Sequence, residues 1–265
     1  MAILDSKTLF DIILVALAGG LIGLDKTAAG QFMISQPIVA GPLMGWMLGD
    51  AATGLIIGIV LELIWVMDIP IGTFVPADST LAAVWATAVA VLGSGGKAQL
   101  PAIGFCILLT VALVPITMWV ETYIRKWNSR LAAAAEPAPG EHAGRRLSRA
   151  HLSGIAGFFV KSFVLYLVLL PLGLIAVHLF SGLPAGFQGA MSLFVKLLPL
   201  LGIASAMRRL SIRTTDGFLL IGFVTAAAIG LALRANFLLV MLVAATATWV
   251  GVKYREGRSQ EHKDA

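Results

Sequence analysis

Charged side chains are scarce in this chain. They make up 12% of its 265 residues, and 58% of the residues are hydrophobic, whereas an average globular domain is about 25% charged and about 45–50% apolar. Several apolar runs reach the roughly 20 residues that a helix needs to cross the hydrocarbon core of a membrane. The runs cover residues 9–24, 37–67, 81–93, 102–120, 155–180, 189–207, 217–233 and 236–252. The sequence therefore predicts an all-α protein, a polytopic integral membrane helical bundle.

Other scarcities exclude further classes of protein. The single cysteine, Cys106, excludes an intramolecular disulfide, and its place in an apolar run predicts a small buried hydrophobe. Neither GxxxxGK[ST] nor HExxH occurs, and no nucleophile–base pair or metal cluster is recognisable. We therefore expect no catalytic residue, no metal and no cofactor. The N-terminus has no basic stretch leading into a short apolar run, so we expect the first run to be retained.

Most of the basic residues gather in three polar segments, which cover 121–151, 207–215 and 252–265. Because cytoplasmic loops of membrane proteins collect Lys and Arg, we expect these segments and the C-terminus on the cytoplasmic side. The segment 181–188 and the region near Arg234 should then face outward. This placement of the net charge of +5 argues against nucleic acid as a partner.

The predicted organisation has four parts. An N-terminal membrane half, 1–124, precedes a basic cytoplasmic loop, 125–151, which contains the Pro/Gly/Ala-rich stretch AAAAEPAPGEHAGRR. The C-terminal membrane half, 152–252, reads as four ordinary spans, and 253–265 is a cytoplasmic tail. Pro171 and Pro199 lie inside apolar runs, where they are expected to kink the helices or end them early.

The N-terminal half contains acids without bases. Between residues 27 and 96 there is no Lys, Arg or His, yet the segment carries four acids, which are Asp50, Glu62, Asp68 and Asp78. Unpaired carboxylates are costly in apolar surroundings, so they indicate a functional site. Their counter-charges must come from elsewhere, and a partner subunit is the source that we expect.

The same half contains broken or re-entrant helices. As one helix, 37–67 would be about 45 Å long, against a hydrocarbon core of roughly 30 Å. We therefore predict two shorter helices, 37–48 and 51–67, which meet at a turn where Asp50 caps the second. The next stretch, DIPIGTFVPADST, has too many Pro and Gly residues for a regular helix. Transporters place substrate sites in such discontinuous segments.

Small residues recur at a spacing of about four in this region. They are Gly41, Gly45, Gly49, Gly54 and Gly58. This spacing permits close contact between helices, within the bundle or against a partner. The alternative is that the glycines line a path for a substrate.

Residues 15–95 resemble the IIC membrane subunit of the mannose/fructose/sorbose family of bacterial phosphotransferase systems. The matching elements are Asp25, Gln31, Gln36-Pro37, Gly49-Asp50, Gly54, Gly58, Leu61-Glu62, and Pro76 with Asp78. The second half is similar only in its hydropathy and in the short stretch GFLLIGFVTAAA, 217–228. The resemblance implies a multi-pass permease subunit of the bacterial inner membrane, in an oligomer. A IID subunit would share the path of a hexose. A cytoplasmic IIB protein, phosphorylated by IIA, would phosphorylate the sugar, so IIC itself would not be an enzyme.

Glu62 and Asp78 are the leading candidates for sugar contact. A carboxylate can accept two hydroxyl hydrogen bonds at once, and charged acceptors make the stronger bonds. The alternative role for both is the capping of broken helices. The other candidates for substrate binding are Gln36, Asp25, Gln31, Thr73 and Ser79.

Two questions stay open at this level. An ion-coupled secondary transporter would use Glu62 or Asp78 as a proton site, and a structural or regulatory membrane subunit without transport is also compatible with the sequence. The basic segment 121–151 can set the topology, bind anionic lipid or dock phosphorylated IIB. The sequence does not identify the sugar.

Overall fold

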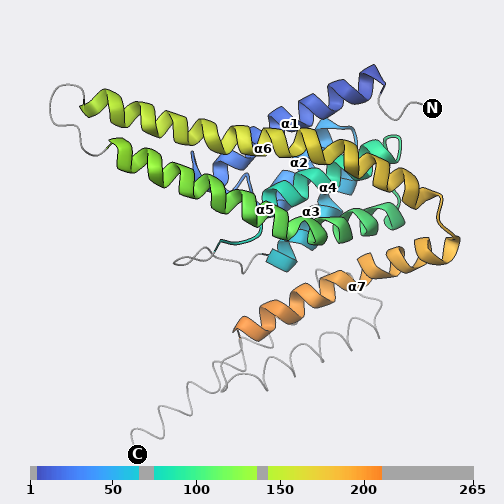
Figure 1. The fold of residues 1–265 in the computed structure, drawn as a ribbon. Coiled ribbons are helices and arrows are strands. Elements are labelled where there is room, and N and C mark those ends of the chain that lie inside the picture. The colour runs from blue at the N-terminus through green and yellow to red at the C-terminus, as the bar shows by residue number, and fades with distance from the viewer. Residues whose placement is uncertain (1–4, 66–74, 136–142, 211–265) are drawn as a thin grey trace, which may run out of the picture. The chain divides into compact units, whose positions relative to one another are not determined.

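The computed structural model describes residues 5–65, 75–135 and 143–210, which form seven helices and no strand within these ranges (Figure 1). The helices are α1 (Ser6–Thr27), α2 (Pro37–Met47), α3 (Ala51–Trp65), α4 (Ser79–Gly93), α5 (Leu100–Ala135), α6 (Ala143–Ser181) and α7 (Ala185–Leu210). The chain divides into two compact units, Met1–Gly202 and Ile203–Ala265, and the first holds everything described below. The predicted helical class is confirmed, while the apolar runs 217–233 and 236–252 lie outside the described residues.

Four helices are long and apolar enough to cross a membrane, by length and composition. These stretches are Ser6–Thr27, Leu100–Ala135, Gly144–Ser181 and Ala185–Gly202. The other three apolar helices, α2, α3 and α4, have 11, 15 and 15 residues. At about 1.5 Å per residue, none of these three reaches across a core of roughly 30 Å. The N-terminal half therefore differs from a series of simple spans.

The apolar run 37–67 is broken where the sequence predicted. Helix α2 ends at Met47 and α3 begins at Ala51. Gly49 adopts a φ of 91° in the turn, a conformation that glycine adopts without strain. Asp50 then caps α3, because its carboxylate accepts the Thr53 N–H at 3.1 Å and the Thr53 hydroxyl at 2.6 Å. Both the two-helix prediction and the cap at Asp50 are confirmed.

Helices α2 and α3 pack backbone against backbone through their glycines. A Cβ atom on Gly54 would collide with the carbonyl group of Gly41, and one on Gly58 would collide with the carbonyl oxygen of Pro37. Such close approach is possible only for residues without a side chain. The packing interpretation is therefore confirmed for Gly41, Gly45, Gly54 and Gly58, whereas a Cβ on Gly49, in the turn, would meet nothing within 4 Å.

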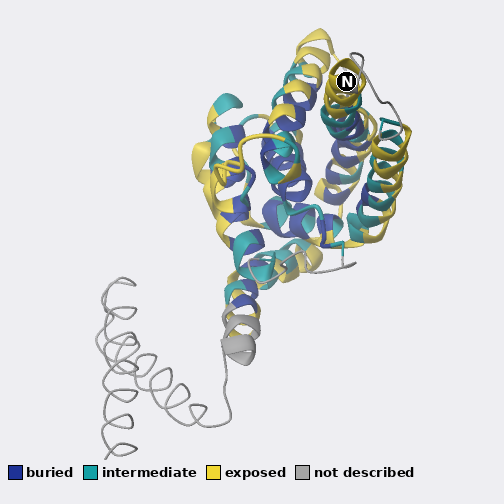
Figure 2. Cartoon of the chain, turned by 90° about the vertical axis from the view of Figure 1, so that its left-hand side faces the viewer, coloured by how far each residue is buried: buried dark blue, intermediate teal, exposed yellow. Residues whose placement is uncertain are grey.

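Helix α4 forms the centre of the bundle. All of its residues from Thr80 to Val91 are buried, and it contacts α1, α2, α3, α5 and α6 (Figure 2). The helix has no charged residue, and a helix that is apolar all round is buried by its neighbours. The predicted buried cysteine, Cys106, lies in the same core.

Helices α5 and α6 are much longer than a membrane is thick. With 36 and 39 residues, they measure about 54 and 58 Å. The described parts of the basic segment 121–151 continue these helices, up to Ala135 and from Ala143. Pro171 lies inside α6 and Pro199 inside α7, so neither proline ends its helix.

Candidate functional site

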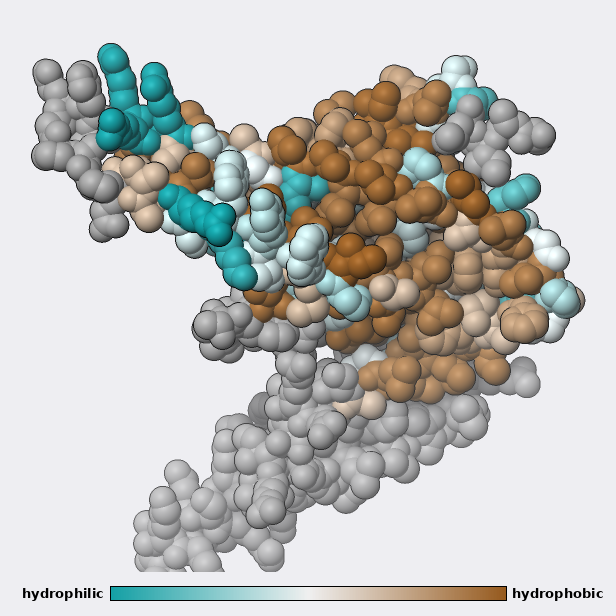
Figure 3. All heavy atoms as spheres, in the orientation of Figure 1, coloured by the Kyte–Doolittle hydropathy of each residue, from teal (hydrophilic) through white to brown (hydrophobic). Residues whose placement is uncertain are grey.

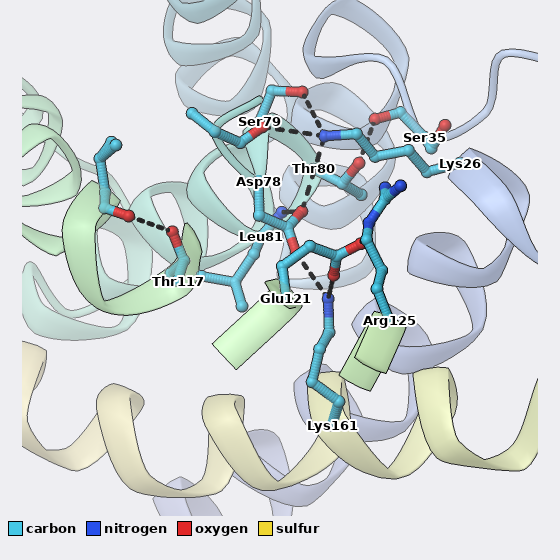
Figure 4. Close-up of polar contacts among 12 residues, drawn as sticks. Lys26, Ser35, Asp78, Ser79, Thr80, Leu81, Thr117, Glu121, Arg125 and Lys161 are labelled. Carbon is cyan, nitrogen blue, oxygen red and sulfur yellow. Dashed lines mark hydrogen bonds and ion pairs between the residues drawn. The ribbon is translucent and has the colours of Figure 1, made fainter. Parts of the chain in front are cut away.

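Asp78 lies where four parts of the chain meet. It precedes α4 and caps it, since its Oδ1 accepts the Leu81 N–H at 3.2 Å. Its Oδ2 accepts a hydrogen bond from Nζ of Lys161 on α6 at 2.9 Å. Nζ of Lys26 on α1 lies 4.0 Å from Oδ1. The carboxylate therefore has both the capping role and a charged partner (Figure 4).

Lys161 joins a second carboxylate to this group. Its Nζ also donates to Oε2 of Glu121 on α5 at 2.8 Å, and Oε1 of Glu121 accepts from Nε of Arg125 at 2.9 Å. The Lys161 side chain is only 6% exposed, and those of Asp78 and Glu121 are 10% and 9% exposed. We call Lys26, Asp78, Glu121, Arg125 and Lys161 the buried charge cluster.

The buried charge cluster corrects the prediction about the source of the counter-charge of Asp78. The counter-charge of Asp78 was expected from a partner subunit, but Lys161 and Lys26 of the same chain supply it. Both lysines lie outside the stretch 27–96, so the absence of bases in that stretch did not mean an unpaired acid. The cavity beside the cluster has a volume of about 10 Å³, which is about the space that one water molecule needs.

Asp25 organises the loop between α1 and α2. It is 7% exposed, and its carboxylate accepts the N–H of Phe32 at 2.6 Å and that of Ser35 at 3.0 Å. The loop contains two non-glycine residues with positive φ, Gln31 at 57° and Met33 at 67°. Such conformations are strained and persist where the surroundings hold them. Asp25 supplies that hold from inside the bundle.

The loop is also fixed to α4, and α2 to α3. The Thr80 hydroxyl donates to the carbonyl oxygen of Ser35 at 2.7 Å. Glu62, on α3, accepts the N–H of Ile38 in the first turn of α2 at 3.2 Å. A carboxylate at this position complements both the free N–H groups and the helix dipole. Glu62 therefore caps the N-terminus of α2, which is the alternative role considered for it. Within the described ranges Glu62 has no ionic partner.

Most of the candidates for substrate binding lie in one region of the structure, although their side chains differ in how many hydrogen bonds they make there. Gln36 stands at the N-terminus of α2 without a side-chain capping bond, and the Gln31 side chain is exposed. Ser79 accepts a hydrogen bond from Nζ of Lys26 at 3.4 Å. Six of the seven candidates, namely Asp25, Gln31, Gln36, Glu62, Asp78 and Ser79, therefore lie around the loop 28–36 and the ends of α1, α2, α3 and α4. Thr73 lies outside the described residues.

The turn at Asp50 lies apart from the six candidate residues around the loop 28–36. The pKa of Asp50 is lowered, first because the Thr53 hydroxyl donates to the carboxylate, with the N–H groups of Thr53 and Ala98 adding to the effect against the opposing effect of burial. Asp50 thus acts as a charged cap, as the sequence suggested.

Sequence reasoning missed Lys161, Glu121 and Arg125. A signal was present for Lys161, which is the single charged residue in the apolar run 155–180. An ionisable residue inside a membrane span faces the bundle interior and has a partner there. Glu121 and Arg125 carry the weaker signal of opposite charges four residues apart on a helix.

These features define the class of protein. Its apolar helices suit a membrane, two of them form a tightly packed pair with a break between them, and charged groups are buried among the helices. Such an arrangement of broken helices and intramembrane charge is found in membrane transport proteins.

Comparison with known proteins gives the family. The sequence profile described as "PTS system sorbose-specific IIC component" matches residues 9–249, and the chain belongs to this family. It is a permease component of the sorbose/mannose type, as the resemblance over residues 15–95 indicated.

Individual relatives are similar over most of their length. The sorbose-specific EIIC component of Klebsiella pneumoniae is 26% identical over 195 residues, 73% of this chain and 71% of the relative. The mannose-specific EIIC component of Escherichia coli strain K12 is 25% identical over 225 residues, 83% of this chain and 81% of the relative. A solved structure, described as that of a membrane protein, has a TM-score of 0.72 at 24% identity and covers 96% of both chains. That likeness shows the shared fold.

Proposed function

We propose that this chain, together with a IID subunit, forms the path of a hexose across the bacterial inner membrane. A cytoplasmic IIB protein, phosphorylated by IIA, then phosphorylates the arriving sugar. The proposal rests on the family and on its relatives, which are specific for sorbose and mannose. The positive-inside distribution of Lys and Arg supports a cytoplasmic C-terminus.

The observation that carries the proposal is the convergence of polar groups around the loop 28–36. Polar residues from four helix ends meet there in an otherwise apolar bundle, and the side chains of Gln31, Gln36 and Glu62 keep hydrogen-bonding groups unused by the bonds described above. A sugar needs several donors and acceptors at fixed positions, which a rigid loop can provide. Asp25 and Thr80 hold that loop from inside the bundle.

Glu62 and Asp78 have different roles in this proposal. Glu62 is partly exposed and makes one hydrogen bond to the described residues, and we propose that its second oxygen accepts hydrogen bonds from sugar hydroxyls. Asp78 is held by Leu81 and Lys161, so it positions the start of α4 beneath the site. Glu62 is therefore the residue for which we propose sugar contact, and Asp78 is a positioning residue that contacts sugar only if the cluster opens.

Uptake measurements test the proposal. Cells that produce the chain with IIA, IIB and IID should accumulate a hexose as its phosphate, and uptake should require phosphoenolpyruvate. Glu62→Gln keeps an acceptor for the Ile38 N–H but removes the charge, so it should reduce uptake about tenfold or more while the amount of inserted protein stays normal. Glu62→Asp is the matched variant that keeps the charge and shifts it by one methylene.

The outcomes separate the alternatives. Uptake that a proton gradient drives without phosphoenolpyruvate would identify an ion-coupled transporter and overturn the proposal. Absence of uptake of every hexose by the correctly inserted complex would favour a structural or regulatory subunit. Wild-type uptake by Glu62→Gln would remove Glu62 from the sugar site.

A further inference from the structure

The α5–α6 hairpin extends beyond the part of the chain that a membrane can cover. The apolar run of α5 ends at residue 120 and that of α6 begins at residue 155, while the helices continue to Ala135 and from Ala143. At about 1.5 Å per residue, roughly 22 Å of α5 and roughly 18 Å of α6 project past the hydrocarbon core. Figure 1 shows the two helices side by side reaching past the other helices of the first unit. We call the described residues 121–135 and 143–154 the projecting hairpin.

The projecting hairpin is strongly basic. Residues 122–154 contain six bases, which are Arg125, Lys126, Arg130, Arg145, Arg146 and Arg149, and two acids, Glu136 and Glu141. Arg125 is paired with Glu121, but the other five bases are exposed and form no salt bridge within the described residues. Hydrophilic side chains gather at this end in Figure 3, whereas the visible body of the bundle is mostly hydrophobic. An acidic partner would complement this surface.

Distance favours a water-soluble partner over the lipid surface. The headgroup layer on each side of a bilayer is roughly 5–8 Å thick, taken as half the difference between the whole bilayer and its core. Arg130 lies ten residues past the apolar run of α5, and Arg145 ten residues before that of α6, so their Cα atoms are about 15 Å beyond the core. An average helix tilt of about 20° shortens this distance by less than a tenth. The tip of the hairpin is therefore outside the headgroup layer.

An apolar groove runs along the base of the projecting hairpin. It has a volume of about 710 Å³. Its outer part is lined by Tyr123, Trp127 and Leu131 of α5 and by Ser153 of α6, whereas its inner part continues along the apolar run of α6 that begins at residue 155. The Tyr123 side chain is 60% exposed. Stable protein interfaces combine aromatic anchors in an apolar centre with a polar rim. Arg130 follows Trp127 by three residues and so flanks the groove on the helix surface.

We propose that the projecting hairpin is a docking surface for a water-soluble protein with an acidic face and an apolar ridge that contacts the outer part of the groove. Under the function proposed above, on which this identification of the partner rests, the IIB component is that protein. The basic tip attracts and orients it, and Tyr123 and Trp127 form the apolar contact.

Binding of purified IIB to the full chain, assembled with IID in phosphatidylcholine nanodiscs, tests this proposal. Arg145→Gln/Arg146→Gln should weaken binding about fivefold, because each charge pair at the rim of an interface contributes modestly. Tyr123→Ala should weaken it about tenfold as the loss of an aromatic anchor. The matched control is Lys7→Gln/Lys97→Gln, which removes two exposed positive charges outside the hairpin and should bind IIB like the wild type.

The hairpin variants alter only exposed side chains, so a folding defect is not expected to obscure the result. Equal affinity of wild type and both hairpin variants would overturn the docking surface, and so would an effect that appears only when phosphatidylglycerol replaces phosphatidylcholine, which would identify a lipid contact. Phosphoenolpyruvate-dependent uptake separates the two proposals. If uptake is present and IIB binds all variants equally, the docking surface is wrong and the proposed function stands. If the wild type shows neither uptake nor binding of IIB, both are wrong.

Discussion

Lys161 places one ammonium group between two carboxylates from different parts of the chain, Asp78 at 2.9 Å and Glu121 at 2.8 Å. The three residues come from α6, the start of α4 and α5. With Lys26 and Arg125 nearby, two acids are surrounded by three bases. Because the lysine is buried, its removal leaves Asp78 with only Lys26, at 4.0 Å, as a counter-charge, while Glu121 keeps Arg125 at 2.9 Å. The buried charge cluster therefore connects the start of the central helix α4 to the long helices α5 and α6.

Replacing Lys161 by Met should destabilise the protein strongly. Breaking a buried ion pair from one side costs about 3–5 kcal/mol, since the remaining charge is left uncompensated. Thermal unfolding of the purified chain in detergent should show a clearly lower midpoint than the wild type. The same substitution combined with Asp78→Asn and Glu121→Gln should recover most of the loss, because no carboxylate is then left unpaired.

A matched control is Lys196→Met, which removes an exposed lysine from α7 and should change the midpoint little. If Lys161→Met unfolds at the wild-type temperature, the cluster contributes no net stability. If the triple variant is no more stable than the single one, the loss comes from packing around the lysine and not from the two carboxylates.

Asp78→Asn and Glu62→Gln should both reduce uptake, but for different reasons. Asp78→Asn removes one of the two carboxylates that Lys161 contacts, and Glu121 remains at 2.8 Å, so the protein should lose stability by about 1–3 kcal/mol. Glu62 has no charged partner in the described structure, so Glu62→Gln should unfold within about 0.5 kcal/mol of the wild type. Unfolding and uptake measured on the same preparations distinguish the two cases. Equal loss of stability in both variants would contradict this separation.

The sequence predicted the local features of this region and missed the long-range ones. The break at Asp50, the glycine packing of α2 and α3 and a cap at Asp78 follow from residues within a few positions of one another. Turn chemistry and helix caps are local, so a single sequence carries them. The structure agrees with each of these predictions.

The pairing of Asp78 with Lys161 could not be predicted from residues that are close together in the sequence. The two residues are 83 positions apart, and their contact depends on the register of α6 against α1 and α4. A sequence without an alignment contains no signal for that register. What it does contain is a lone lysine in an apolar run, which indicates an intramembrane partner without naming it. The continuation of α5 to Ala135 and the start of α6 at Ala143 were not predicted, because the basic segment 125–151 was interpreted as a loop between two apolar runs.

The loop 28–36 should loosen when Asp25 is replaced. Asp25→Ala leaves the N–H groups of Phe32 and Ser35 without their acceptor, which costs about 1–3 kcal/mol for each group that stays buried. The strained conformations at Gln31 and Met33 then lose their support. Chymotrypsin, which cuts after Phe32, should cleave the folded variant faster than the wild type.

Asp5→Ala provides the control for that experiment. Asp5 also accepts a backbone N–H, that of Thr8 at 2.8 Å, but it caps the other end of α1. Cleavage at Phe32 should therefore be unchanged in this variant. Equal cleavage rates for Asp25→Ala and the wild type would show that the loop conformation does not depend on the carboxylate.

Acidification should weaken the contribution of Asp50. Its pKa is lowered from the ordinary value of 3.8, chiefly because the Thr53 hydroxyl donates to the carboxylate. A lowered pKa means that the charged form stabilises the fold above the unfolded-state pKa, and that this contribution disappears as the pH falls through the folded-state value. Asp50→Asn keeps a capping oxygen but cannot titrate. The difference in unfolding temperature between wild type and Asp50→Asn should therefore be constant at neutral pH and shrink below pH 3.8. A difference that grows on acidification would contradict the assigned direction.

The α2–α3 contact should tolerate no side chain at Gly54. A Cβ there would collide with the carbonyl group of Gly41, and both partners are backbone atoms that cannot rotate away. Gly54→Ala should therefore destabilise the protein by about 1–3 kcal/mol through overpacking. The control is Gly189→Ala in α7, where a Cβ meets nothing within 4 Å, so a helical glycine is replaced without a clash and stability should stay equal or rise by about 0.5–1 kcal/mol. Because the candidate site lies on the ends of these helices, Gly54→Ala should also reduce sugar uptake. A Gly54→Ala protein with wild-type unfolding temperature would show that the two helices can separate without cost.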